Sequence, residues 1–218
     1  MARMRIIIAG GHGKIALRLA ARLAPESEAV GLVRNPAHVA DVEAAGGQGL
    51  VCDLERASVD EVTGIVEGAD AVVFAAGAGP GSGAARKDTV DRAASVLMAD
   101  AAERAGVRRF VQISAMGTGK PPAPGSDEVW AAYIKAKTEA EEDLRRRDLD
   151  WTILRPGRLT DEPGTGRVLL APEVPRGAVP RDDVAAVIVA LLGAPGTAGR
   201  TLELVSGDTP IDEAVAAL

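Results

Sequence analysis

Residues 5–16 read RIIIAGGHGKIA, and this stretch decides the fold. An apolar run typical of a strand gives way to a glycine turn, and a helical pattern starts at once at Lys14. Gly10 permits a tight turn, Gly13 leaves room for a phosphate beside the backbone, and the small Ala16 allows close packing of helix on strand. The free N–H groups at the helix start attract anions. The order of strand, turn and helix predicts a unit that binds the pyrophosphate of a dinucleotide.

Apolar runs and helical periods alternate along the rest of the chain. The runs are nearly continuous in Ile, Val and Leu, which is typical of parallel strands covered on both faces. This pattern predicts one α/β domain over residues 1–218, a Rossmann-type doubly wound parallel sheet in three layers, α/β/α. The expected strands are 5–9, 29–33, 49–51, 71–75, 110–113, 151–154 and 201–205, and the expected helices are 14–23, 58–66, 89–105, 128–147, 182–192 and 211–218.

Composition narrows the function classes. The chain has 218 residues, 47% of them hydrophobic and 26% charged, which is ordinary for a globular protein. The net charge of −6 and the scattered basic residues argue against a nucleic-acid partner. The N-terminal sequence fits neither a signal peptide nor a membrane span, so we expect a cytoplasmic protein with no membrane partner. The single cysteine, Cys52, predicts no disulfide and no metal site.

Three irregular segments follow the fourth, fifth and sixth expected strands: residues 77–87, 117–127 and 159–180. In an open parallel sheet, ligands bind in the crevice at the carboxyl ends of the strands, so these segments and the first glycine turn share one edge. We expect them to form small substrate-side loops, and the glycines of the last one would permit a lid motion. The alternative is that they are only solvated connections.

Arg34 stands at the end of the second expected strand, where a site that prefers NAD usually carries a carboxylate. A guanidinium can hold the 2′-phosphate of NADP in a forked pair of hydrogen bonds, so Arg34 favours NADP as the cofactor. The competing interpretation is an ordinary surface arginine in a turn before Pro36. Asp53, after the third strand, could accept a hydrogen bond from the adenine amino group, or could cap the helix that begins near Ser58.

Tyr133 and Lys137 are four positions apart in a helical stretch, so both side chains project from one face. An ammonium beside a phenol lowers the pKa of the phenol, which lets tyrosine exchange a proton with a substrate oxygen. Ser114, after the fifth strand, could hold that oxygen with its hydroxyl. Trp130 could flank the same pocket or pack into the core.

Six short stretches and one residue pair carry a resemblance to a known family: 10–16, 33–36, 52–54, 75–77, 109–114, 154–157 and the pair Tyr133 and Lys137. Over nearly its whole length the chain resembles the short-chain dehydrogenase/reductase superfamily, and more narrowly its atypical members, including NmrA-like and biliverdin reductase B-like proteins and NAD(P)-dependent epimerases. The resemblance implies catalytic roles for Ser114, Tyr133 and Lys137. The expected cofactor contacts are Gly10, Gly11, His12, Gly13, Lys14, Ile15, Arg34, Asp53, Leu54, Ala75, Ala76, Gly77, Lys137 and Pro156.

Two positions depart from that family's pattern. Ala16 replaces the last glycine of the extended-type turn, and Asp91 stands where the active-site tetrad would have asparagine. Asp91 is therefore a fourth candidate catalytic residue, or else a solvent-facing residue in a polar helix start.

The resemblance implies an NADP-dependent oxidoreductase that acts on a small-molecule carbonyl or alcohol. The sequence leaves the oligomeric state open between a homodimer and a monomer. An epimerase would use the same residues for transient oxidation. A non-enzymatic NADP redox sensor of the NmrA type is the alternative that the altered tetrad supports.

Overall fold

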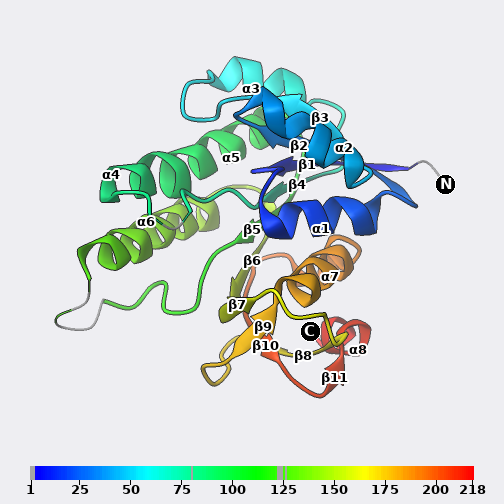
Figure 1. The fold of residues 1–218 in the computed structure, drawn as a ribbon, viewed down its shortest axis with the longest axis vertical. Helices are drawn as coiled ribbons and strands as arrows, with labels where there is room; N and C mark the ends of the chain where they lie inside the picture. Colours follow the sequence, from blue (N-terminus) through cyan, green and yellow to red (C-terminus); the bar gives the residue numbers. More distant parts are fainter. Residues whose placement is uncertain (1–2, 80, 122–124, 126) are drawn as a thin grey trace.

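A mostly parallel sheet forms the centre of the molecule in the computed structural model (Figure 1). The structure describes residues 3–79, 81–121, 125 and 127–218. Residues 1–2, 80, 122–124 and 126, which include parts of the predicted loops 77–87 and 117–127, lie outside the described residues. The parallel strands are β1 (Met4–Ala9), β2 (Ser27–Val33), β3 (Gln48–Val51), β4 (Ala71–Phe74), β5 (Arg109–Ile113), β6 (Asp150–Pro156) and β10 (Arg200–Ser206).

The strand order is β11-β8-β10-β6-β5-β4-β1-β2-β3 in the described part of the chain. The chain runs outward from β1 to β3 and then returns to place β4 on the other side of β1. This reversal is the switch point at which ligands bind in doubly wound sheets. It places the glycine turn after β1 beside the loop after β4.

Helices cover both faces of the sheet, as Figure 1 shows. Successive residues of β1 point to opposite cores, Ile6 and Ile8 to one and Ile7 and Ala9 to the other. The helices α1 (Lys14–Leu23), α7 (Arg181–Leu192) and α8 (Ile211–Ala216) close the first core, and α3 (Val59–Val66), α5 (Ala94–Ala105) and α6 (Glu128–Arg145) close the second. The predicted three-layer Rossmann-type fold is therefore confirmed.

The predicted sheet departs from the structure at its late edge. Residues 159–180, expected to be a loop, contain β8 (Arg167–Ala171), which pairs antiparallel with β10, and β9 (Ala178–Pro180), which pairs with β7 (Arg158–Thr160). A further strand, β11 (Thr209–Pro210), extends this edge. Val168 and Leu170 are buried while Leu169 is 41% exposed, the alternation of a strand with one covered face. The flanking glycines and prolines masked this short pattern.

Helical segments also differ from the prediction. The 3₁₀ turn Pro36–His38 and the helix α2 (Val39–Ala44) were not predicted, because six residues with one buried side chain carry little periodicity. The expected helix 89–105 begins earlier, with α4 (Ala84–Arg86) and a π-helical segment at Lys87–Ala93. Helix α6 ends at Arg145 and not at 147. None of the helices in the described ranges is long and apolar enough to cross a membrane.

Candidate functional site

The glycine turn after β1 is closely packed against its neighbours. Gly10 has φ +79°, and a Cβ at this position would lie 2.6 Å from the Cα of Ala76. A Cβ on Gly11 would lie 2.5 Å from the Cα of Gly31, while its N–H donates to Leu32 O at 2.8 Å. The prediction that Gly10 makes the tight turn is confirmed. Gly11 lets the turn approach β2, a role that depends on tertiary contact.

The N-terminus of α1 faces this turn with its backbone donors available. Gly13 is the N-cap residue, and within the described residues no side chain caps the helix and no acidic residue stands in its first turn. The first N–H groups of a helix need a partner, and an anion at this end also interacts favourably with the helix dipole. The residues present therefore fit the pyrophosphate of a dinucleotide.

A cleft of about 350 Å³ opens beside the turn. Nine of the predicted cofactor contacts line it: Gly10, His12, Gly13, Arg34, Asp53, Leu54, Ala75, Ala76 and Gly77. Five others lie outside its lining: Gly11 and Ile15 pack within the fold, Lys14 turns to Asp161, and Lys137 and Pro156 lie deeper in the molecule. The cleft thus unites the carboxyl ends of β1, β2, β3 and β4.

Sequence reasoning missed several residues of this cleft. Glu55, Arg86 and His38 line it and were not predicted. Glu55 stands only two positions after the predicted contact Asp53, and Arg86 lies within the loop predicted at residues 77–87. No spacing rule in the sequence pairs an arginine with a glutamate thirty-one positions away.

Glu55 connects three segments at the end of the cleft lined by Arg34 and Arg86, which we call the nucleotide end. Arg34 Nη1 lies 2.8 Å and Arg86 Nη2 2.7 Å from the same oxygen, Oε2 of Glu55. Thr89 Oγ1 donates to the other oxygen at 2.7 Å. Partial burial raises the pKa of Glu55, but the hydrogen bonds from Thr89, Arg86 and Arg34 outweigh burial and leave that pKa below its ordinary value. Glu55 is therefore a carboxylate at neutral pH.

Asp53 and His12 have specific contacts inside the protein. Asp53 Oδ1 accepts the backbone N–H of Glu55 at 3.1 Å, and α3 is capped by Ser58, so the helix-capping alternative for Asp53 is wrong. His12 Nε2 lies 2.8 Å from Asp41 Oδ2, and its ring stacks on that of His38 with centroids 3.6 Å apart. His12 thus connects the glycine turn to α2, the helix that follows β2.

Asp91 and Lys137 form a buried ion pair at the candidate catalytic end. Their side chains are 1% and 5% exposed, and Lys137 Nζ lies 3.4 Å from Asp91 Oδ1. Lys137 also donates to Ile113 O at 3.1 Å, and Asp91 Oδ2 accepts the N–H of Ala78 at 3.1 Å. Burial lowers the pKa of Lys137, and the Asp91 charge offsets this only in part. The alternative that Asp91 faces solvent is therefore wrong.

Tyr133 lies beside this pair but does not behave as the spacing predicted. Lys137 Nζ is 6.0 Å from the centre of its ring, and Lys87 Nζ is 5.3 Å away. Burial raises the pKa of Tyr133, and the Asp91 charge raises it further. The expectation that Lys137 lowers this pKa is wrong, because burial of the phenol and then the Asp91 carboxylate raise it.

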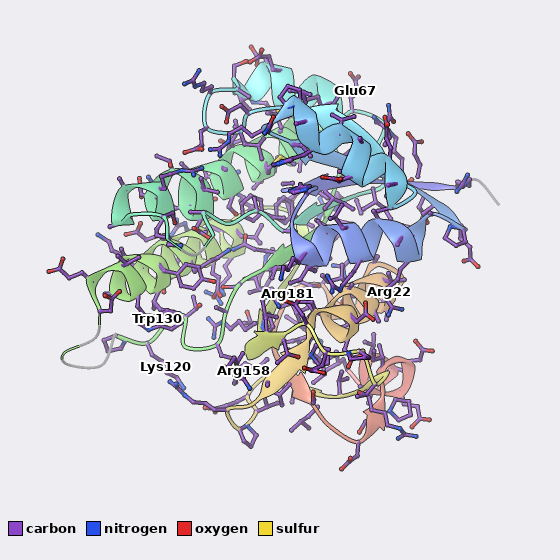
Figure 2. All side chains as sticks on the ribbon, in the orientation of Figure 1. Arg22, Glu67, Lys120, Trp130, Arg158 and Arg181 are labelled. Atoms are coloured by element: carbon purple, nitrogen blue, oxygen red, sulfur yellow. The ribbon has the colours of Figure 1, made fainter. Side chains whose placement is uncertain are left out.

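Ser114 and Trp130 lie near this cluster on different segments. The Ser114 side chain is buried after β5, next to the carbonyl that Lys137 contacts, and its hydroxyl lies 3.3 Å from that of Thr118. Trp130 is 49% exposed near the start of α6 (Figure 2), and its ring centre lies 5.5 Å from that of Tyr133. Core packing, one of the two expectations for Trp130, is thereby excluded.

The segment after β7 is fixed to the glycine-turn helix. Asp161 Oδ2 accepts a hydrogen bond from Lys14 Nζ at 2.6 Å, and Asp161 Oδ1 accepts one from Arg181 at 2.9 Å. Arg181 is labelled in Figure 2. The carboxylate of Asp183 accepts the backbone N–H groups of Thr165 and Gly166 at 3.0 and 2.9 Å. These contacts hold the predicted lid segment near the start of α1, and the lid motion stays a prediction.

Comparison with known proteins places this geometry in a family. A family model described as NAD(P)H-binding matches residues 10–195. An uncharacterized sugar epimerase, YhfK of Bacillus subtilis strain 168, is 35% identical over 97% of this chain and 99% of its own. The solved structure of a candidate NAD-dependent epimerase/dehydratase from Bacillus halodurans has a TM-score of 0.91 at 35% identity, covering 99% of this chain and 100% of its own. ChuY, an anaerobilin reductase of Escherichia coli O157:H7, has a TM-score of 0.77 at 26% identity, covering 94% and 98%.

Proposed function

We propose that this chain, which belongs to the NAD(P)H-binding family, is an NADP-dependent oxidoreductase that acts on a small carbonyl or alcohol. The observation that carries the proposal is the position of Arg34 on the wall of the cleft that the glycine turn opens. A guanidinium matches a phosphate in charge and shape, whereas a carboxylate at that position would repel it. The name of ChuY, a reductase, agrees with a redox role.

The chain's own residues divide the work between two ends. The glycine turn and the N-terminus of α1 would hold the pyrophosphate, and Arg34 would hold the 2′-phosphate. When bound, the nicotinamide supplies or accepts a hydride. Tyr133 would exchange a proton with the substrate oxygen, which the Ser114 hydroxyl would hold by a hydrogen bond. A tyrosine is protonated at neutral pH, and burial followed by the Asp91 charge raises the pKa of Tyr133 further, so in a reduction it would start as the proton donor.

The test is turnover of NADPH against a panel of small aldehydes, ketones and conjugated ketones, followed by the absorbance of the reduced nicotinamide. Tyr133→Phe should lower the rate on any active substrate by about 10²-fold or more, because the proton donor is lost. Lys135→Ala is the matched control, since this exposed residue of the same helix pairs only with Glu139 among the described residues. Undiminished turnover by Tyr133→Phe would show that the assigned role is wrong.

A sugar-type epimerase is a second candidate, supported by the names of the relatives from B. subtilis and B. halodurans. It would use the same residues for an oxidation that is reversed within one cycle. Net accumulation of oxidised cofactor in proportion to product supports the reductase, whereas product formed without such accumulation supports the epimerase.

The Asp91–Lys137 ion pair favours a third candidate, a non-enzymatic NADP redox sensor. Lys137 is paired with this carboxylate, and burial followed by the Asp91 charge raises the pKa of Tyr133, which opposes the assistance that the catalytic role requires of the lysine. A sensor must bind NADP⁺ and NADPH with different affinities, since a ligand shifts a conformational equilibrium only through such a difference. Equal affinity for the two forms would exclude this candidate.

A further inference from the structure

Two guanidiniums converge on one carboxylate oxygen at the nucleotide end of the cleft. Arg34 follows β2, Glu55 follows β3 and Arg86 ends α4, so three separate segments meet there. Arg34 Nη1 and Arg86 Nη2 lie 2.8 and 2.7 Å from Glu55 Oε2. All three residues line the cleft that contains the glycine turn.

The position of that oxygen marks a point where an anion is stabilised from two sides. Arginine presents its N–H groups in a rigid fork that suits carboxylates and phosphates alike. Glu55 is the anion that belongs to the chain, and a phosphate brought by a ligand would need the same donors. Two negative groups at one point repel each other, so the carboxylate and a phosphate compete.

The arginines are free enough to turn toward a ligand. The side chains of Arg34 and Arg86 are 55% and 41% exposed, and ion pairs with that exposure contribute little to stability. Glu55 keeps a separate partner when the arginines leave, because Thr89 Oγ1 donates to its other oxygen. An exchange of anions between the arginines therefore leaves the carboxylate hydrogen-bonded.

We infer that Arg86 is a second guanidinium ligand for the 2′-phosphate of NADP, and that Glu55 competes with this phosphate and so sets the preference between NADPH and NADH. The inference rests on the proposed cofactor. A phosphate with both arginines is held from two walls of the cleft. NADH lacks that phosphate, so its binding leaves the Glu55 contacts undisturbed.

The experiment is calorimetric titration of NADPH and of NADH into the purified wild type, Arg86→Ala and Glu55→Gln. Arg86→Ala should weaken the binding of NADPH by about tenfold or more, which is the effect of losing one charged hydrogen-bonded contact. The same variant should change the affinity for NADH little. Glu55→Gln should raise the affinity for NADPH several-fold, because the charge that competes with the phosphate is gone. The affinity for NADH should stay unchanged. Arg104→Ala, which removes an exposed arginine paired with Asp60 and outside the cleft lining, is the control.

Each failure has its own signature. If the wild type binds neither nucleotide, the proposed function is wrong and this inference falls with it. If the wild type binds NADPH but Arg86→Ala weakens both nucleotides equally, or neither, only the role of Arg86 is overturned. Weaker NADPH binding by Glu55→Gln would contradict competition and make Glu55 an organiser of the arginines. Arg86→Lys separates charge from shape, with an NADPH affinity expected between those of wild type and Arg86→Ala.

Discussion

The nucleotide end and the candidate catalytic end of this site share one edge of the sheet but are built differently. At the nucleotide end, backbone conformation and partly exposed ion pairs shape a cleft around Gly10, Arg34 and Glu55. At the catalytic end, the charges of Asp91 and Lys137 are paired out of contact with water. The first end is therefore ready to exchange its internal contacts for a ligand, whereas at the second any change of charge affects the stability of the fold.

The largest effect expected from this difference is on stability. Asp91→Ala leaves the Lys137 ammonium buried without its partner and should lower the free energy of unfolding by about 3–5 kcal/mol. Asp88→Ala, which removes a 54% exposed carboxylate paired with Arg92 in the same segment, should cost about 1 kcal/mol or less. Urea unfolding of both variants checks the contrast. Equal losses would mean that burial of the Asp91–Lys137 pair does not distinguish the two ends.

A smaller but still large loss is expected at the glycine turn. Gly10→Ala forces a left-handed conformation on a residue with a Cβ and drives that Cβ into the backbone of Ala76. The cost is about 2–4 kcal/mol, and the altered turn should abolish nucleotide binding. Unfolding and calorimetry together test this. Retention of NADPH binding by a folded Gly10→Ala protein would refute the assigned role of the turn.

The ionisation of Tyr133 can be followed separately at the candidate catalytic end, because Tyr133 is the only tyrosine in the chain. Its pKa in the folded protein is raised above the ordinary value of 10.0 by burial and then by Asp91. The folded state thus holds the proton more tightly than the unfolded state, so the stabilisation is complete below pH 10 and is lost as the pH rises toward the folded pKa.

Ultraviolet difference spectroscopy of tyrosinate follows this group alone. We expect no phenolate signal from the folded protein at pH 10, and a flatter decline of stability above that pH in Tyr133→Phe. Ionisation below pH 10 would mean that the Lys137 charge outweighs both burial and Asp91, as the helical spacing alone suggested.

The smallest predicted effect is a gain. Gly64 lies exposed in α3, and a Cβ there would meet nothing within 4 Å among the described atoms. Gly64→Ala should therefore raise the free energy of unfolding by about 0.5–1 kcal/mol and leave nucleotide binding unchanged. A loss of unfolding free energy comparable to that of Gly10→Ala would show that replacing glycine is costly wherever it occurs. The cost at Gly10 would then not be evidence for a specific role of the turn.

The sequence pattern predicted those parts of the molecule whose structure depends on residues close together in the chain. The strand, turn and helix at residues 5–16 form as expected because continuous apolar runs and glycine conformation act over a few residues. The Arg34–Glu55–Arg86 contact joins two loops and the end of α4, three segments far apart in sequence, and has no local signature. The raised pKa of Tyr133 has two causes, first its burial and then a carboxylate forty-two positions away, and the spacing of Tyr133 and Lys137 reveals neither.

The central claim, that the cleft holds NADP through Arg34, is tested most directly by titrating NADPH and NADH into the wild type and Arg34→Ala in a calorimeter. We predict that the wild type binds NADPH more tightly than NADH, and that Arg34→Ala removes most of this difference while NADH binding stays nearly constant. Equal affinity of the wild type for the two nucleotides, or an Arg34→Ala protein that keeps the full preference for NADPH, would contradict the claim.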